Sequence, residues 1–318
     1  MILSKCPLRI SLVGGSTDSD LFLQKYKKGS VISFTPNLYT FVTIHKNNIK
    51  RYIINYSIKE IEEDIDNIKN DIVRECVKFF NTPYCTITFN SNILSSGSGL
   101  ASSSSYTISV VKAISLFQNL NLTDTEICNY AFQLEKKINP LAGQQDVYGC
   151  GIGNFKRIDF FPESPQTYKF LDISFITNNY EMYLLNTNIV RNSTNVLKTI
   201  DIDKSYPLLN LVDKFENCIL KKDTDQFFDL FNDGWKLKKL TSKEIMNNSS
   251  LLDLDLFLSN ISSVKGIKLC GAGGGGYFFL FVDKKEKIYF EQIVENKLKH
   301  NMLINVGIDS KGVQGTKI

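Results

Sequence analysis

A segment rich in glycine and serine is the part of the sequence best suited to bind an anion. It reads Gly97-Ser98-Gly99-Leu100-Ala101 and continues through Ser102–Ser105 into the helical pattern of residues 106–117. Glycines allow close approach of the backbone and positive φ, and the free N–H groups at a helix N-terminus favour phosphate. Serine hydroxyls also suit Mg²⁺, which prefers oxygen ligands. The segment predicts a phosphate site, with a surface loop capped by serines as the alternative.

Two carboxylates follow at positions where they could act on such a phosphate. Thr123 and Glu126 form a capping box, which predicts a helix that ends at Asn139-Pro140. Glu135 lies at the edge of the apolar stripe of this helix. Asp146 comes 11 residues later, in a glycine-rich stretch over 141–154 that we expect to be a loop. Chemistry on a hydroxyl needs one carboxylate to hold metal and one to contact the proton, although an isolated acidic residue is usually only solvated.

A second glycine segment, Gly271 to Gly276, contains the Gly-x-Gly-x-x-Gly spacing. In dinucleotide-binding proteins this spacing follows a strand and opens a helix. Here it opens the strand-like YFFLFV, so we reject that interpretation and expect a turn, or close approach to a substrate or another loop. The chain also has no Gly-Lys dipeptide of a Walker A loop and no HRD or DFG signature of protein kinases.

The remaining pattern predicts a two-lobed α+β protein. Strands are expected within residues 8–13, 30–45, 85–90, 180–188, 267–270, 277–282 and 302–308. Helices are expected over 70–80, 106–117, 123–138, most of 190–262 and 284–300. Pro162 and Pro165 lie in a polar run that favours a domain boundary, which divides the chain into residues 1–170 and 171–318.

The composition limits the class of protein. The 318 residues are 43% hydrophobic and 22% charged, as in ordinary globular proteins, and neither a membrane span nor a signal peptide is expected. The net charge of +4 is spread along the chain, and we interpret the basic run 236–239 as a solvated helix face, so no nucleic-acid partner is expected. Seven scattered cysteines without a Cys-x-x-Cys pair favour a reduced, cytoplasmic protein.

Three segments occur in a distinctive order: PLRISLVGGSTD (7–18), SGSGLASSSS (96–105) and KLCGAGGGGYFFLFV (268–282). Together they resemble the three motifs of the GHMP kinases, and the resemblance covers essentially the whole chain. The first segment, LAGQQDVYG (141–149) and NTNIVRNST (186–194) are most similar to the heptose 7-phosphate kinase branch of that superfamily.

The resemblance implies roles for individual residues. Ser103 and Glu135 match the ligands of Mg²⁺, Asp146 matches the aspartate at the attacking hydroxyl, and Arg9 matches a basic residue near the transferring phosphate. The residues expected to bind the ATP phosphates are Gly97, Ser98, Gly99, Leu100, Ala101, Ser102, Ser103 and Ser104. Those expected to bind the sugar or its phosphate are Gly15, Ser16, Thr17, Asp18, Gln145, Arg191, Gly273, Gly274 and Gly275.

The sequence departs from the family pattern at two positions. Ser16 replaces a glycine of the usual GGGTD, which bears on sugar choice, and Ala101 replaces a glycine of the usual GLGSS. An alanine is strained there only if its φ is positive, so the second change bears on nucleotide binding.

The resemblance also implies a fold and an activity. The N-terminal lobe should resemble domain 2 of ribosomal protein S5, with a left-handed β-α-β crossover, and the C-terminal lobe should be ferredoxin-like. The implied activity is Mg²⁺-dependent transfer of the γ-phosphoryl group of ATP to the anomeric hydroxyl of heptose 7-phosphate. The alternatives are a sugar-1-kinase for an unphosphorylated fucose- or galactose-like sugar and an inactive sugar sensor. A homodimer is a possible assembly.

Overall fold

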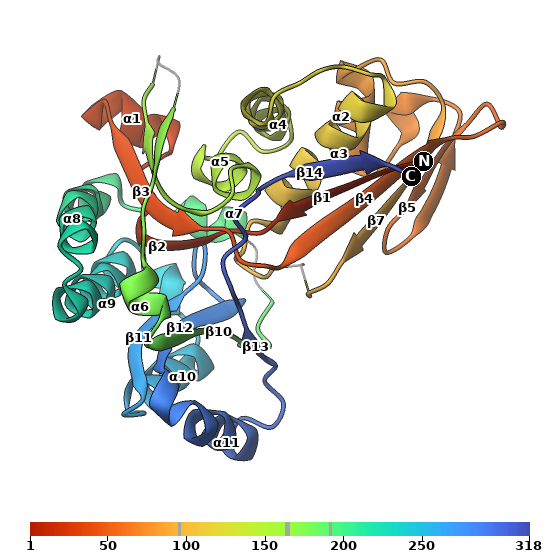
Figure 1. Ribbon diagram of the computed structural model, residues 1–318. Coiled ribbons are helices and arrows are strands. Elements are labelled where there is room, and N and C mark those ends of the chain that lie inside the picture. Colours follow the sequence, from red (N-terminus) through yellow and green to blue (C-terminus); the bar gives the residue numbers. More distant parts are fainter. Residues whose placement is uncertain (95–96, 163–165, 191–192) are drawn as a thin grey trace.

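The largest sheet carries its helices on one face (Figure 1). The computed structural model describes residues 1–94, 97–162, 166–190 and 193–318. The sheet runs β14-β1-β4-β7-β5-β6, with β1 (Ile2–Pro7), β4 (Tyr39–Lys46), β5 (Tyr52–Asn55), β6 (Lys59–Glu62), β7 (Cys85–Ser91) and β14 (Gln314–Lys317). Helix α3 (Ser102–Phe117) packs on β1 and β4, and α2 (Asp71–Phe79) and α4 (Asp124–Ile138) pack against α3. The sheet thus fixes the start of α3.

A second sheet runs β2-β3-β8-β9 and connects the lobes. Its strands are β2 (Ile10–Gly14), β3 (Gly29–Phe34), β8 (Phe155–Phe160) and β9 (Thr167–Phe170). Helix α1 (Asp20–Tyr26) joins β2 to β3, and α5 (Gln145–Gly151) precedes β8. Helix α8 (Ile202–Lys221) packs on β2 and β3, whereas α9 (Thr224–Leu240) contacts both β2 and the C-terminal sheet.

The C-terminal sheet is antiparallel in the order β11-β12-β10-β13. Its strands are β10 (Tyr180–Asn186), β11 (Val264–Leu269), β12 (Tyr277–Asp283) and β13 (Leu303–Asn305). Helices α7 (Ser193–Leu197), α8, α9 and α10 (Ser249–Ser259) lie between β10 and β11 in the chain, and α11 (Lys287–Lys297) lies between β12 and β13. The short helices are η1 (Ile65–Asn67), α6 (Ser174–Thr177), η2 (Lys243–Met246) and η3 (Lys284–Glu286). This element order is ferredoxin-like, and the predicted α+β class is confirmed.

The end of the chain returns to the N-terminal lobe. Strand β14 pairs with β1 in antiparallel register, and the two termini lie together in Figure 1. Strand β14 therefore belongs to the sheet of the N-terminal lobe. The division of the chain into residues 1–170 and 171–318 stays a prediction. Among the described residues, no helix has the length and apolarity needed to cross a membrane.

Two predicted elements differ from the structure. Helix α3 begins at Ser102 rather than at residue 106, and residues 145–151, expected to be loop, form α5. The glycines of α5 explain the second difference, because they allow close packing rather than a turn. A Cβ on Gly149 would lie 3.1 Å from Cγ of Arg9, and one on Gly151 would lie 2.2 Å from Sγ of Cys128. The sequence also did not indicate β1, β5, β6, β8, β9, β14 or α1.

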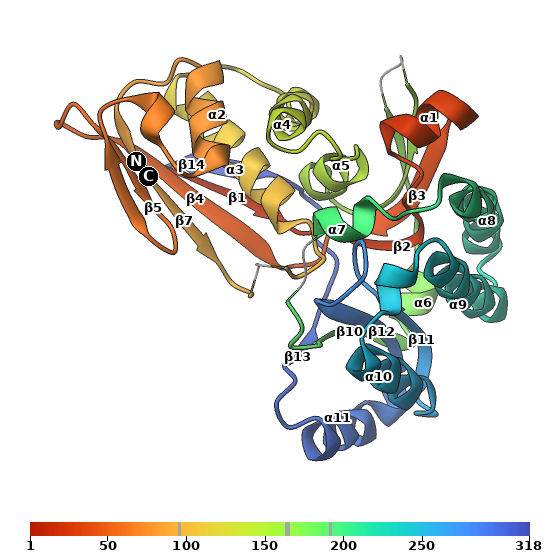
Figure 2. The same cartoon turned by 180° about the vertical axis from the view of Figure 1, so that it is seen from behind.

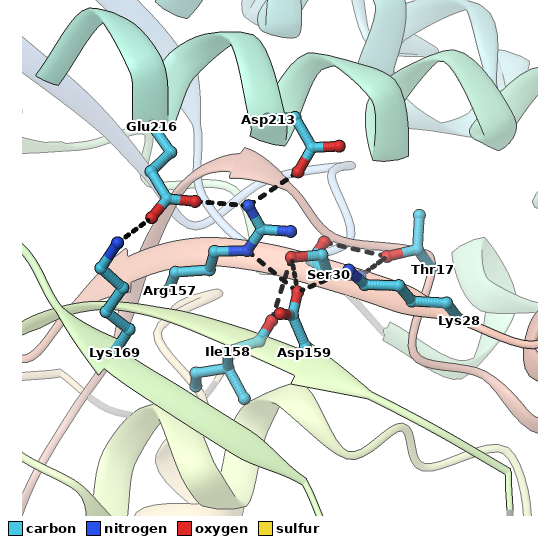
Figure 3. Close-up of polar contacts among 9 residues, drawn as sticks. All are labelled: Thr17, Lys28, Ser30, Arg157, Ile158, Asp159, Lys169, Asp213 and Glu216. Atoms are coloured by element: carbon cyan, nitrogen blue, oxygen red, sulfur yellow. Dashed lines mark hydrogen bonds and ion pairs between the residues drawn. The ribbon is translucent and has the colours of Figure 1, made fainter. Parts of the chain in front are cut away.

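An ion-pair network joins α8 to the second sheet (Figure 3). Arg157 Nε donates to Asp159 Oδ1 at 3.0 Å, and its Nη1 contacts Asp213 at 2.7 Å and also Glu216. Ser30 Oγ donates to the same Asp159 oxygen at 2.6 Å. The backbone of Ser30 in turn holds the hydroxyl of Thr17, just after β2. The network therefore fixes the loop after β2 relative to α8.

Lys156 on β8 is a buried lysine whose charge should affect stability. Its side chain is fully buried, its Nζ donates to the carbonyl of Gly149 at 3.0 Å, and burial lowers its pKa from 10.5 to about 7. Between these two pKa values the unfolded chain binds more protons than the folded one. Stability should therefore rise with pH above about 7, by up to about 1.4 kcal/mol per pH unit.

We expect Lys156→Met to reduce the rise in the free energy of unfolding between pH 7 and pH 9, because methionine has no proton to lose. Part of the rise should remain, since burial also lowers the pKa of Lys268 to about 7. Urea denaturation at several pH values measures the slope. Lys221→Met, at an exposed position of α8, is the control and should keep the wild-type slope. An unchanged slope in Lys156→Met would mean that Lys156 stays charged in the folded protein.

Candidate active site

A cavity of about 930 Å³ brings most of the predicted site residues together. Both lobes line it, since Leu197, Lys238 and Gly271 from the C-terminal half face residues of the first half. Figure 2 shows α7 between the helices of the N-terminal lobe and α8. The predicted residues that line the cavity are Arg9, Ser16, Asp18, Gly97, Ser98, Gly99, Ala101, Ser102, Ser103, Ser104, Glu135, Gln145 and Asp146.

The glycine-serine segment has the geometry of an anion site. Gly97 and Gly99 have φ of +65° and +80°, and α3 begins directly after them, so its free N–H groups face the cavity end of the helix. Ser98 Oγ accepts from the backbone N–H of Leu100 at 3.2 Å and lies 2.8 Å from Ser102 Oγ. Leu100 itself is fully buried, and its carbonyl accepts from the backbone N–H of Arg9. It contributes through its backbone rather than its side chain.

The second glycine segment, Gly271 to Gly276, packs against the glycine-serine segment and other loops. A Cβ on Gly276 would lie 2.3 Å from the carbonyl oxygen of Ser98, and one on Gly275 would lie 2.4 Å from that of Ile189. A Cβ on Gly273 would lie 2.7 Å from Cγ2 of Ile245. Of the two uses weighed for this segment, the structure favours close approach to other loops. Among the described residues, Gly273, Gly274 and Gly275 do not line the cavity, although Gly271 and Ala272 do.

Ala101 adopts the left-handed conformation, with φ +61° and ψ +44°. The family pattern has glycine here, and the condition for strain at this alanine is therefore met. A non-glycine residue in this region costs about 1–2 kcal/mol.

We expect Ala101→Gly to stabilise the protein by about 1 kcal/mol and to raise Tm by a few degrees, because glycine relieves this strain. Thermal unfolding measures the change. Ala113→Gly, in the interior of the same helix, is the matched control and should destabilise. If Ala101→Gly also destabilises, the left-handed conformation of residue 101 is not present in solution.

Arg9, which is buried, forms an ion pair with the partly exposed Asp146 at the centre of the site. Arg9 is 3% exposed, and its Nε and Nη2 donate to Asp146 Oδ1 at 3.0 and 2.7 Å. Its Nη1 donates to the carbonyl of Gly99 at 2.7 Å. Burial is the largest single influence and lowers the pKa of Arg9, but the charge and hydrogen bonds of Asp146 together with the nearby Cys150 outweigh it, so that the pKa is raised and the guanidinium stays charged. Because Arg9 takes only Oδ1, Oδ2 of Asp146 is left for a ligand.

Glu135 has the environment expected of a ligand for a divalent cation. Its Oε2 accepts from Ser104 Oγ at 3.0 Å, whereas its buried Oε1 has no hydrogen-bond partner. Burial raises its pKa to about 8, because the charged carboxylate is unfavourable there unless a cation lies beside it. A Mg²⁺ ion beside Oε1 would satisfy this oxygen. The donors therefore fit the metal that the resemblance implies.

Two serines are candidates for the second protein ligand of Mg²⁺. Ser103, the residue expected from the resemblance, is exposed at the cavity, and Ser104 is the one bonded to Glu135. Among the described residues no group of three or more His, Cys, Asp or Glu side chains could hold a metal. A Mg²⁺ ion here would thus take few protein ligands, as is usual where phosphates and water supply the rest.

The loop after β2 and the start of α5 form the far side of the cavity. Asp18 Oδ2 accepts from the backbone N–H of Gln145 at 2.9 Å, and Gln145 Oε1 is buried without a partner. Gly15 has φ +78°, and a Cβ there would lie 3.0 Å from that same oxygen. Thr17 is different, because it is fully buried and its hydroxyl is bonded to the backbone of Ser30 on both sides. Among the described residues, Gly15 and Thr17 do not line the cavity.

Several residues that line the cavity were not predicted from the sequence. Lys238 was interpreted as part of a solvated helix face, which is wrong: it is 8% exposed and lines the cavity. Tyr106, Asn139 and Lys198 also line it. Only the short helical run of lysines could have hinted at Lys238. The predicted Arg191 lies outside the described residues.

Comparison with known proteins identifies the class. Residues 69–154 match the family described as GHMP kinases N terminal domain. The resemblance to GHMP kinases is thereby confirmed, and with it the prediction of an ATP-dependent phosphotransferase.

Individual relatives narrow the class further. The chain is 28% identical over 310 residues to a D-glycero-alpha-D-manno-heptose 7-phosphate kinase of Campylobacter jejuni, which covers 90% of this chain and 91% of the relative. It has the fold of a D-glycero-D-manno-heptose 1-phosphate kinase from Bacteriodes thetaiotaomicron, with a TM-score of 0.80, 21% identity and coverage of 100% and 99%. A Lactococcus lactis galactokinase gives a TM-score of 0.80 at 16% identity, with coverage of 98% and 95%. Sugar kinases therefore stand among its relatives.

Proposed function

We propose that this protein transfers the γ-phosphoryl group of ATP to the anomeric hydroxyl of D-glycero-D-manno-heptose 7-phosphate, giving the 1,7-bisphosphate. The observation that carries the proposal is the Arg9–Asp146 pair, which links a carboxylate in the cavity to the Gly99 carbonyl of the glycine-serine segment. A group that activates a hydroxyl and a group that binds phosphate are thus held together by one guanidinium.

The ATP phosphates bind at Gly97–Ser104, against the N-terminus of α3. Mg²⁺, held there by Glu135 with Ser103 or Ser104, supplies charge neutralisation when bound. Arg9 stabilises charge on the transferring group, as cationic side chains do in phosphoryl transfer.

Asp146 acts on the acceptor. Its Oδ2 orients the anomeric hydroxyl and takes its proton while the hydroxyl oxygen bonds to the γ-phosphorus and the bond from that phosphorus to the bridging oxygen of ADP breaks. The buried, unpartnered Oε1 of Gln145 supports a sugar hydroxyl beside it, since such an acceptor is costly to leave unsatisfied. Asp18 and Ser16 line the same side, and Arg191 stays a predicted contact of the sugar phosphate.

The chemistry of the chain suggests its setting. Among the described residues, the seven cysteines are all buried and none forms a disulfide, which supports a reduced, cytoplasmic environment. A homodimer stays a prediction.

Release of ADP over a panel of acceptors tests the proposal. The panel contains heptose 7-phosphate, the unphosphorylated heptose, fucose and galactose, each with ATP and Mg²⁺. We expect the highest kcat/KM with heptose 7-phosphate. A preference for an unphosphorylated sugar would replace this acceptor by a simple sugar, and no ADP with any acceptor would favour an inactive sugar sensor.

A further inference from the structure

Lys238 is the lysine of the run 236–239 that turns into the cavity. Lys236 is 72% exposed and pairs with Asp233 on the surface, and Lys239 pairs with Asp255 on α10. Lys238 is 8% exposed and lies on α9, the helix that contacts both lobes. Lys238 thus brings an ammonium group to the wall of the cavity between the lobes.

The side chain of Lys238 is held by a residue that departs from the family pattern. Its Nζ donates to Ser16 Oγ across the cavity wall. Ser16 has φ +58°, a conformation that glycine adopts freely and serine does not. The serine at this position thus tolerates strain and supplies the hydroxyl that positions the ammonium.

The charge of Lys238 acts on its surroundings. Burial raises the pKa of Asp18, and Lys238 is among the groups that counteract this. Burial first, and then the charge of Lys238, lower the pKa of Lys268 to about 7. An anion bound beside Lys238 would relieve this repulsion, and it would gain a charge-assisted contact from an ammonium that Ser16 already orients.

Resting on the proposed function, we propose that Lys238 binds the phosphate group of the acceptor and so selects a sugar phosphate over the unphosphorylated sugar. The acceptor rather than ATP is favoured because Lys238 contacts Ser16, two residues from Asp18. The glycine-serine segment instead leads into α3, and Glu135 on α4 contacts Ser104 at the start of that helix. Ser16 is a positioning residue for the ammonium.

Calorimetric titration without ATP tests this assignment on the whole protein. Heptose 7-phosphate and unphosphorylated heptose are titrated into wild type, Lys238→Met, Lys238→Arg and Ser16→Gly. We expect Lys238→Met to raise Kd for heptose 7-phosphate about 10–100-fold, the scale of one charge-assisted contact, with a much smaller effect on the free heptose. Lys238→Arg should retain most of the affinity, and Ser16→Gly should lose a few-fold. Lys236→Met is the matched control and should bind as wild type does.

The results distinguish failure of the proposed function from failure of the role proposed for Lys238. Wild type that fails to bind heptose 7-phosphate overturns the proposed function and this inference with it. Wild type that binds, with Lys238→Met unchanged, overturns the inference alone, and so does equal weakening for both ligands. Thermal unfolding of each variant shows whether a loss of affinity reflects a misfolded protein. If Lys238→Met is misfolded, Lys238→Arg, which keeps the charge, shows whether the positive charge is enough to bind heptose 7-phosphate.

Discussion

Asp146→Asn is expected to lower kcat by about 10²–10⁴-fold, the usual contribution of a group that takes or orients a proton. Asparagine keeps an oxygen that can accept from Arg9 but no longer offers a carboxylate to the acceptor hydroxyl. KM for ATP should change much less, because the glycine-serine segment does not depend on this charge for its geometry. Steady-state kinetics with saturating ATP and Mg²⁺ measures both constants.

The control for this variant is Asp253→Asn, at an exposed position of α10, which should have wild-type kinetics. Thermal unfolding should show that Asp146→Asn remains folded, although Arg9 loses part of its compensation. Near-normal kcat in a folded Asp146→Asn would remove Asp146 from the chemical step.

Glu135→Gln should lower kcat/KM by about 10²–10³-fold, since loss of a charged metal ligand removes several kcal/mol of charge stabilisation. Glutamine fills the same space and can still accept from Ser104, so the effect should lie in the metal rather than in packing. Activity measured over a Mg²⁺ titration should show that the variant needs a much higher concentration, while wild type saturates.

The same titration assigns the second ligand. Ser103→Ala and Ser104→Ala are compared with Glu295→Gln, an exposed control on α11. The serine whose loss shifts the Mg²⁺ requirement is the ligand. If that serine is Ser103, Ser104→Ala removes only the hydrogen bond to Glu135. An unshifted Mg²⁺ requirement in Glu135→Gln would contradict a metal site at this carboxylate.

The sequence predicted those features whose structure depends on interactions between residues close in the chain. The Thr123–Glu126 capping box was predicted from residue types alone, and both of its hydrogen bonds are present. The glycine-serine segment has the positive φ at Gly97 and Gly99 and the helix start at Ser102 that its residue types indicate, and its binding of phosphate stays a prediction. The strain at Ala101 was predicted only as a condition, since φ is set by the packing around it.

Contacts between distant residues account for what was missed. Gly149 and Gly151 have low helix propensity, yet they lie in α5 because Arg9 and Cys128 leave no room for larger residues. Lys238 could not be distinguished from Lys236 and Lys239 by composition, because only the packing of α9 between two lobes decides which lysine faces the cavity. Strand β14 depends on a pairing with the other end of the chain.

The position of the new phosphate on the product distinguishes transfer to the anomeric hydroxyl from transfer to any other hydroxyl. The names of the two heptose kinase relatives differ in the phosphate that they specify, so the site of transfer has to be measured on this protein. Heptose 7-phosphate is incubated with ATP, Mg²⁺ and the protein, and the product is examined by ³¹P NMR. We predict a second phosphorus signal coupled to the anomeric proton, together with one ADP per product. A phosphate on any other carbon, or ADP without a sugar bisphosphate, would contradict transfer to the anomeric hydroxyl of heptose 7-phosphate.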